Sequence, residues 1–331
     1  MTSSTPHYKP PPMKDLTIEN ITDNVHAINA GCESARLRFL FERLAVHLHD
    51  FARETHLSTK EWTAAIRFLT ETGQICSDTR QEFILLSDIL GLSLLVDSID
   101  HPKPPGSTEG TVLGPFHVAD AEHGELGTQI SHDPEGEPLL VVCSVKDTAG
   151  RPLAQTSVDV WETDSRGFYD VQYVDREGFD GRAVLETDDE GIFHFKAIVP
   201  VPYPIPDDGP VGKLLKVLKR HPYRPSHMHF KFDRAGYDPL ITALYLRGDP
   251  YETSDAVFGV KESLIIDLYK VSQFEGYTEK YAVSGDTKLL KYDFVLVTEK
   301  ETHDLRDINA MKAAESLGMD LKLEDGKVVR K

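Results

Sequence analysis

The 331-residue sequence is poor in cysteine, with three residues at widely separated positions, Cys32, Cys76 and Cys143. No two of them form a Cys-x-x-Cys pair, so neither a disulfide framework nor a thiolate metal site is indicated. A reducing, intracellular setting is therefore expected.

Basic residues are also scarce, because 36 lysines and arginines stand against 54 aspartates and glutamates, for a formal net charge of −18. Binding to phosphates requires clustered positive charge, so neither nucleic acid nor an anionic membrane is expected as a partner. No apolar run approaches the length of a membrane span, and the N-terminus lacks the basic-then-apolar order of a secretory signal. These features predict a soluble, cytoplasmic protein.

The N-terminal third has the periodicity of helices. Residues 1–20 contain four prolines among polar side chains and predict a mobile arm. The apolar stripe of a first helix is formed by Leu37, Phe41, Leu44, Leu48 and Phe51. Ser58 and Glu61 form a capping-box pair that opens a second helix, and a third, mostly apolar helix is expected from Asp78 to Val96. We expect an all-helical domain over residues 21–106, with apolar surface left for dimerisation.

A breaker cluster at residues 101–107 separates this helical part from a region of short β-rich runs. These runs cover residues 139–145, 157–162, 192–198, 227–232, 240–246, 264–269 and 293–298. Turn residues separate them, which is typical of an antiparallel β-sandwich. The expected fold class is therefore α+β, with a helical subdomain followed by an antiparallel β-sandwich catalytic domain over 107–300 and a C-terminal tail over 301–331. Short helices are expected at 210–219 and 305–317.

Two histidines lie on one expected strand, in the segment Arg-Pro-Ser-His-Met-His-Phe-Lys-Phe at residues 224–232. Strand side chains alternate between faces, so His227 and His229 share one face while Met228, Phe230 and Phe232 face the core. Neutral imidazole is the commonest protein ligand of transition metals. Taken alone, however, such a pair is more often solvated or hydrogen-bonded than bound to a metal.

Two tyrosines lie in loops beside expected strands, where functional sites are often built. Tyr169 follows the run at 157–162, and Tyr203 lies in a proline-rich loop. A phenol with a pKa near ~10 ligates a metal at neutral pH only where a strong Lewis acid such as Fe(III) stabilises the phenolate. Taken alone, both tyrosines are better explained as core residues with one satisfied hydroxyl.

Four motifs resemble those of the intradiol ring-cleavage dioxygenases. They are EGTVLGPF at 109–116, DVWETDSRGFYD at 159–170, YPIPDDGP at 203–210 and RPSHMH at 224–229. Their order and approximate spacing are similar to those of the family, and the resemblance extends over most of residues 25–300. The segments DVQY at 170–173, PIPDDGP at 204–210 and DAVFGV at 255–260 look more like the hydroxyquinol 1,2-dioxygenase branch, particularly its fungal members.

The resemblance implies one non-haem Fe(III) per chain, held by Tyr169, Tyr203, His227 and His229. It implies cleavage of hydroxyquinol by O2 between adjacent hydroxylated carbons, giving 3-hydroxy-cis,cis-muconate or maleylacetate. Tyr203 matches the family's axial ligand, which the substrate displaces. Arg224 matches the arginine that stabilises negative charge on the ring, a role suited to a guanidinium that stays protonated.

Substrate choice in the family is implied to depend on the last N-terminal helix and the loop after it. Asp97 is the informative position, because a carboxylate there could accept a hydrogen bond from a third ring hydroxyl. An exposed residue at a helix C-terminus explains it equally well. Ala243 stands where the catechol branch usually has glutamine, and no function is transferred to it. The matching substrate-binding candidates are Leu94, Asp97, Val112, Leu113, Gly114 and Arg224.

The implied partners are a small aromatic diol or triol, O2 and a second copy of the chain bound through the helical domain. Several members of the family also hold a lipid in the dimer core. Catechol or chlorocatechol 1,2-dioxygenase activity remains a close alternative. A non-catalytic β-sandwich binding module and a zinc hydrolase built on His227, His229 and a carboxylate are further alternatives from other classes.

Overall fold

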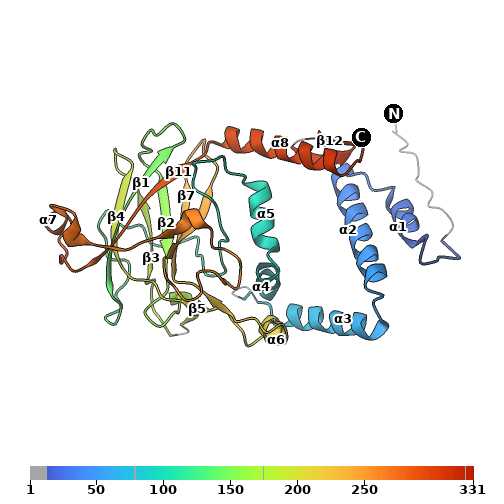
Figure 1. The fold of residues 1–331 in the computed structure, drawn as a ribbon, viewed down its shortest axis with the longest axis horizontal. Coiled ribbons are helices and arrows are strands. Elements are labelled where there is room, and N and C mark those ends of the chain that lie inside the picture. Colours follow the sequence, from blue (N-terminus) through green and yellow to red (C-terminus); the bar gives the residue numbers. More distant parts are fainter. Residues whose placement is uncertain (1–12, 78–79, 174, 325) are drawn as a thin grey trace. The chain divides into compact units, whose positions relative to one another are not determined.

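The computed structural model describes residues 13–77, 80–173, 175–324 and 326–331. These residues divide into two compact units, one comprising the chain up to Leu69 with Arg306–Lys331, the other Thr70–Leu305. The order of their helices and strands along the chain is labelled in Figure 1. Within the described ranges, no helix is long and apolar enough to cross a membrane.

The first unit contains all or part of three predicted helices and several elements that the sequence did not predict. Its elements are α1 (Ile21–Asn29), α2 (Ala35–Glu54), the start of α3 (Thr59–Gln74), most of α8 (Glu299–Ser316), β12 (Leu321–Glu324) and β13 (Lys327–Arg330). The predicted capping box is confirmed, since the Ser58 backbone N–H donates to Glu61 Oε2 at 2.9 Å. The apolar stripe of α2 is exposed in the single chain. The helix predicted at 305–317 corresponds to α8, but α1 and the hairpin of β12 and β13 were missed.

The single helix predicted from Asp78 to Val96 is wrong. Two helices, α4 (Glu82–Ile89) and α5 (Leu92–Asp100), replace it, and Gly91 lies between them with φ at +72°. This left-handed conformation is readily available to glycine and ends a right-handed helix. Asp78, the expected start of that helix, lies outside the described residues.

The second unit is built around two sheets and confirms the predicted sandwich of mostly antiparallel strands. One sheet has the order β10 (Tyr269–Lys270), β11 (Lys288–Leu296), β1 (Pro138–Asp147), β4 (Ile192–Ile198). The other has the order β3 (Arg182–Glu186), β2 (Ser157–Trp161), β7 (His227–Asp233), β8 (Leu240–Leu246), β9 (Ile265–Ile266). Only the pairs β1 with β11 and β8 with β9 are parallel among these strands.

Several boundaries differ from the sequence prediction. The strands predicted at 192–198 and 240–246 match β4 and β8, whereas the run at 264–269 is divided between β9 and β10. Strand β11, which was predicted at 293–298, begins at Lys288, five residues before its predicted start. Strand β3 was not predicted. A two-residue ribbon, β5 (Tyr203–Pro204) with β6 (Tyr223–Arg224), and the helices α6 (Pro210–Val217) and α7 (Tyr277–Tyr281) complete the unit.

The main core lies between the two sheets and fixes the direction of the β7 side chains. Met228, Phe230 and Phe232 are fully buried in it, as the alternation predicted. Because successive strand side chains point to opposite faces, His227 and His229 leave β7 on the face turned away from this core.

Candidate active site

The structure brings the four predicted metal ligands together in one buried cluster. The Nε2 atoms of His227 and His229 lie 3.0 Å apart. The hydroxyl of Tyr203 lies 3.5 Å from His227 Nε2 and 3.2 Å from the hydroxyl of Tyr169. None of the four residues is more than 4% exposed, so two phenols and two imidazoles converge out of contact with bulk solvent.

Short-range backbone geometry brings the two tyrosines to the histidines. Tyr203 pairs with Arg224 in the ribbon of β5 and β6, immediately before β7 begins. Tyr169 lies on the loop between β2 and β3, and Gly167 permits its close approach. A Cβ on Gly167 would lie 2.9 Å from the Cβ of Tyr203, and its φ is +82°. Glycine is thus required where the two tyrosine-bearing segments touch.

Burial keeps both histidines neutral in the chain alone. Desolvation, followed by the charge of Arg224, lowers the pKa of His227 well below its usual value. Desolvation likewise lowers the pKa of His229, with smaller contributions from His227 and Arg224. His227 Nδ1 lies 2.6 Å from the carbonyl oxygen of Pro225, which can only accept, so Nδ1 carries the proton and Nε2 the lone pair.

This donor set fits a hard, highly charged transition metal ion. Burial raises the pKa of Tyr169 well above its usual value, so its phenolate needs a strong Lewis acid beside it. Imidazole and phenolate donors together suit iron, and a backbone carbonyl already orients one imidazole for coordination. Among the described residues, no group of three or more His, Cys, Asp or Glu side chains is arranged to hold a metal ion. A zinc site made of the two histidines and a carboxylate therefore finds no support in that part of the chain.

Arg224 is buried against the donors and held by two residues that sequence reasoning did not select. Its Nη1 lies 3.0 Å from His227 Nε2. Its Nη2 donates to the Tyr245 hydroxyl at 3.0 Å, and its Nε donates to Asp255 Oδ1 at 3.3 Å. Asp255 also accepts the backbone N–H of Gly259 at 2.9 Å, so it fixes the following turn and the guanidinium together. No signal in a single sequence links these positions.

The loop after the helices lines the donor cluster with two of the predicted substrate-binding residues. Leu113 packs against the cluster that contains Tyr169 and Tyr203. A Cβ on Gly114 would lie 3.7 Å from His229 Nε2, so glycine leaves space directly beside this imidazole. Val112 and Leu94 lie instead in a neighbouring apolar cluster.

A small cavity of about 40 Å³ adjoins this loop. Its lining residues are Arg80, Gln81, Glu82, Leu85, Asp88, Pro115, Phe116 and Pro206. The ring of Phe116, one of these lining residues, stacks on Tyr169 with centroids 4.6 Å apart. Asp88 is the buried carboxylate in its wall, 5% exposed.

The carboxylates of Asp88 and Asp97 have different electrostatic neighbours. Burial raises the pKa of Asp88, and a hydrogen bond from Ser93 and, more weakly, the charge of Arg224 oppose that shift. Burial also raises the pKa of Asp97, but the charges acting on it are those of His101, Lys261, Lys103 and Asp238, none of which belongs to the donor cluster. The structure thus places Asp88 in the wall of the cavity that Phe116 also lines, and Asp97 against Gly110, where a Cβ would lie 3.1 Å from its carboxylate.

Comparison with known proteins agrees with this geometry. Residues 34–108 match the family model described as the catechol dioxygenase N terminus, and residues 112–298 match the model described as dioxygenase. The chain is 65% identical over 318 residues to the intradiol ring-cleavage dioxygenase hqdA of Aspergillus niger, covering 96% of each chain. It is 45% identical over 279 residues to a hydroxyquinol 1,2-dioxygenase of a Rhizobium species, covering 84% of this chain and 95% of the relative.

A solved structure of hydroxyquinol 1,2-dioxygenase from Pseudomonas putida has the same fold, with a TM-score of 0.79 at 39% sequence identity. The match covers 85% of this chain and 99% of that one. The chain therefore belongs to the intradiol ring-cleavage dioxygenases, a family of oxidoreductases that use non-haem iron.

Proposed function

We propose that the chain is a hydroxyquinol 1,2-dioxygenase that holds one Fe(III) through Tyr169, Tyr203, His227 and His229. The observation that carries this proposal is the buried convergence of two phenols and two imidazoles beside a fixed guanidinium. The names of the relatives from Rhizobium and Pseudomonas putida support hydroxyquinol as the substrate.

Each side chain has a role that its position supports. Bound Fe(III) would accept charge from the deprotonated substrate and so make its ring reactive toward O2. Tyr203 Oη, 3.5 Å from Arg224 Nη1, is placed to accept the proton of an incoming substrate hydroxyl. The guanidinium of Arg224 stabilises the negative charge that develops on the ring. Gly114 leaves room for the ring beside His229, and the apolar side chains of Leu113 and Val112 exclude water.

Asp88 is the residue we propose to recognise the third hydroxyl of the substrate. Its carboxylate is buried, lies in the wall of the cavity next to Phe116, and is acted on by the charge of Arg224. A buried acceptor that loses its partner is costly, so such a site rejects diols without the third hydroxyl. The apolar side of this recognition site would be formed by Leu94, Val112 and Leu85.

We also propose a homodimer formed through the helical region. The exposed apolar stripe of α2 supports it, because monomeric proteins rarely expose contiguous apolar surface of this kind. The cytoplasmic location and the lipid in the dimer core stay predictions from the sequence.

Oxygen uptake by the iron-loaded protein tests the proposed function. Hydroxyquinol, catechol, 4-chlorocatechol and protocatechuate are supplied separately at equal concentration, and uncatalysed autoxidation is subtracted. We expect fast uptake with hydroxyquinol, together with a phenolate-to-iron absorption band that Tyr169→Phe weakens. Uptake led by catechol would keep the reaction and overturn the substrate, and an iron-free, colourless protein would favour a binding module.

A further inference from the structure

Tyr169 differs from the other donors because it lies on a long loop. The two histidines are fixed by strand β7, and Tyr203 by the ribbon with β6, whereas Tyr169 lies on the segment between the end of β2 at Trp161 and the start of β3 at Arg182. A ligand on a loop keeps its geometry only if side chains or backbone contacts hold that loop. The contacts of the residue after Tyr169 provide such a hold.

Asp170 and Arg182 form a buried ion pair directly beside Tyr169. The Arg182 Nε donates to Asp170 Oδ2 at 2.7 Å, and its Nη2 donates to Asp170 Oδ1. Both side chains are only 2% exposed. The same carboxylate accepts the backbone N–H of Asp180 at 3.1 Å, which ties the far end of the loop to its middle. Burial of two charges is costly unless geometry and hydrogen bonding are nearly complete, as they are here.

The guanidinium of Arg182 also contacts the residue whose ring stacks on Tyr169. Its Nη1 donates to the carbonyl oxygen of Phe116 at 3.0 Å. The ring of Phe116 stacks on Tyr169 with an interplanar angle of 24°. One side chain therefore anchors both the chain neighbour of Tyr169 and the ring that covers its face.

Arg182 is itself fixed with respect to the histidines. It pairs with Trp161 in the register of β2 and β3. The indole of Trp161 stacks on the imidazole of His229, with centroids 4.7 Å apart and planes within 5°. The position of Arg182 is thus defined by the same sheet that carries the imidazole donors.

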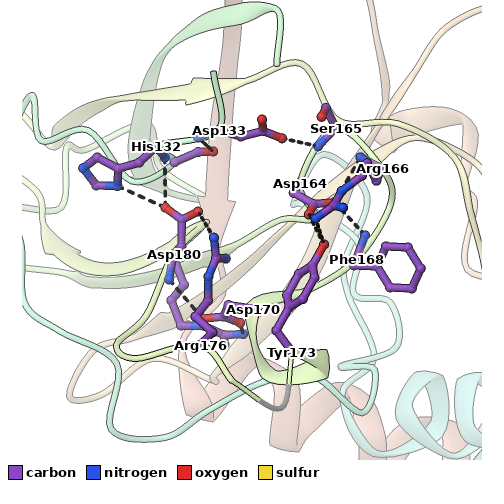
Figure 2. Close-up of polar contacts among 12 residues, drawn as sticks. His132, Asp133, Asp164, Ser165, Arg166, Phe168, Asp170, Tyr173, Arg176 and Asp180 are labelled. Carbon is purple, nitrogen blue, oxygen red and sulfur yellow. Dashed lines mark hydrogen bonds and ion pairs between the residues drawn. The ribbon is translucent and has the colours of Figure 1, made fainter. Parts of the chain in front are cut away.

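Further polar contacts on the same loop, drawn together with Asp170 in Figure 2, supply control positions. Among these contacts, Arg176 pairs with Asp180 at 3.1 Å, and the Tyr173 hydroxyl donates to Asp164. The side chain of Arg176 is 34% exposed, and its ion pair is with Asp180 rather than with Asp170. Its loss removes an ion pair from the same loop without touching the two attachments of Tyr169.

We propose that Asp170 and Arg182 are positioning residues that orient the Tyr169 phenol toward the other three donors. This inference rests on the proposed function, because it assigns Tyr169 to the iron. Neither residue contacts the substrate, and both act only through Tyr169.

The test compares Arg182→Lys and Asp170→Asn with the control Arg176→Gln. Arg182→Lys keeps the positive charge but loses the planar guanidinium, whose N–H groups reach both Asp170 and Phe116. Asp170→Asn keeps the shape of the side chain but loses its negative charge. Each variant is loaded with Fe(III), and its iron content, its phenolate-to-iron absorption band per bound iron, and its kcat and KM for hydroxyquinol are measured.

We expect both variants to shift the absorption band and to lose about 10- to 100-fold in kcat or iron affinity, the range typical of groups that orient metal ligands. KM should change much less, and Arg176→Gln should match the wild type. Phe116→Leu, which removes the stacked ring and keeps the carbonyl, should shift the same band by a smaller amount.

Two results would overturn the inference. Variants that unfold at lower temperature but keep the wild-type band and kcat per bound iron would show that the ion pair supports only the fold. A wild-type protein that binds iron without any phenolate-to-iron band would refute the proposed metal site, and this inference with it. The first result leaves the proposed function standing, so the two failures are distinguishable.

Discussion

Replacing Asp88 by alanine should change which diol the protein prefers. The carboxylate of Asp88 lies in the wall of the cavity beside Phe116, and the charge of Arg224 acts on it. Alanine removes the acceptor that we assign to the third hydroxyl of hydroxyquinol. Catechol has no such hydroxyl, so its turnover does not depend on that acceptor.

The size of the effect follows from the chemistry of the lost contact. A hydrogen bond to a charged group contributes about 1.5–3 kcal/mol. Since each 1.4 kcal/mol corresponds to about a tenfold change, the ratio of kcat/KM for hydroxyquinol over catechol should fall roughly 10- to 150-fold. Because Asp88 is only 5% exposed, screening by solvent weakens this hydrogen bond only slightly. The space left by the smaller alanine side chain lowers kcat/KM for both substrates, so this general effect cancels in the ratio.

Asp97→Ala is the matched control. Asp97 also has its pKa raised by burial and lies on the next helix, but the charges acting on it are outside the donor cluster. Steady-state rates of oxygen uptake with both substrates measure the ratio for the two variants. Equal losses on hydroxyquinol and catechol in Asp88→Ala would refute the assignment, and a selective loss in Asp97→Ala would transfer the role to that residue.

Four further predictions test separate parts of the structure. Tyr245→Phe removes the hydroxyl that accepts a hydrogen bond from Arg224 Nη2. The activation free energy should rise by about 1.5 kcal/mol, so kcat should fall by about tenfold while the iron content stays unchanged. A wild-type kcat would contradict this. Gly191→Ala places a Cβ 2.5 Å from the Val145 carbonyl oxygen, at a residue whose φ is +72°. The free energy of unfolding, measured in urea, should therefore fall by at least about 1 kcal/mol, and a wild-type urea midpoint would contradict this. Ser58→Ala should lower the unfolding free energy by about 1 kcal/mol through loss of the capping box. Chelation should remove colour and activity, and Fe(III) should restore both, whereas Zn(II), with its filled d shell, should restore neither.

The histidine pair could be predicted because one local rule decides it. A period of two separates His227 and His229 from the apolar Met228, Phe230 and Phe232, and the structure buries the apolar set between the sheets. Helix α2 was predictable for the same kind of reason, since its stripe of leucines and phenylalanines repeats at three and four residues.

The aspartate that we propose to face the substrate was harder to identify because the pattern Leu-Leu-x-Asp occurs twice, at residues 85–88 and 94–97. The two copies share their leucines, their aspartate and their spacing, so the local pattern alone gives no reason to prefer one of them. Gly91, with its left-handed φ, interrupts the helix between them and turns the two copies toward different surroundings. Which copy borders the donors is therefore a tertiary property.

The contacts that fix Arg224 and Tyr169 are also tertiary, whereas the two histidines are held by one strand. This difference between the residues of the site predicts which of them a substitution disturbs most easily. His227 and His229 depend on the backbone hydrogen bonds of a central strand, which many residues share. Tyr169 depends on one buried ion pair whose partners, Asp170 and Arg182, are joined by a loop and by a strand that the sequence pattern did not predict. Removing one partner of such a pair leaves an uncompensated buried charge, whereas single substitutions in a strand leave most of its ladder intact. Substitutions that spare all four ligands should therefore disturb the geometry of Tyr169 before that of either histidine.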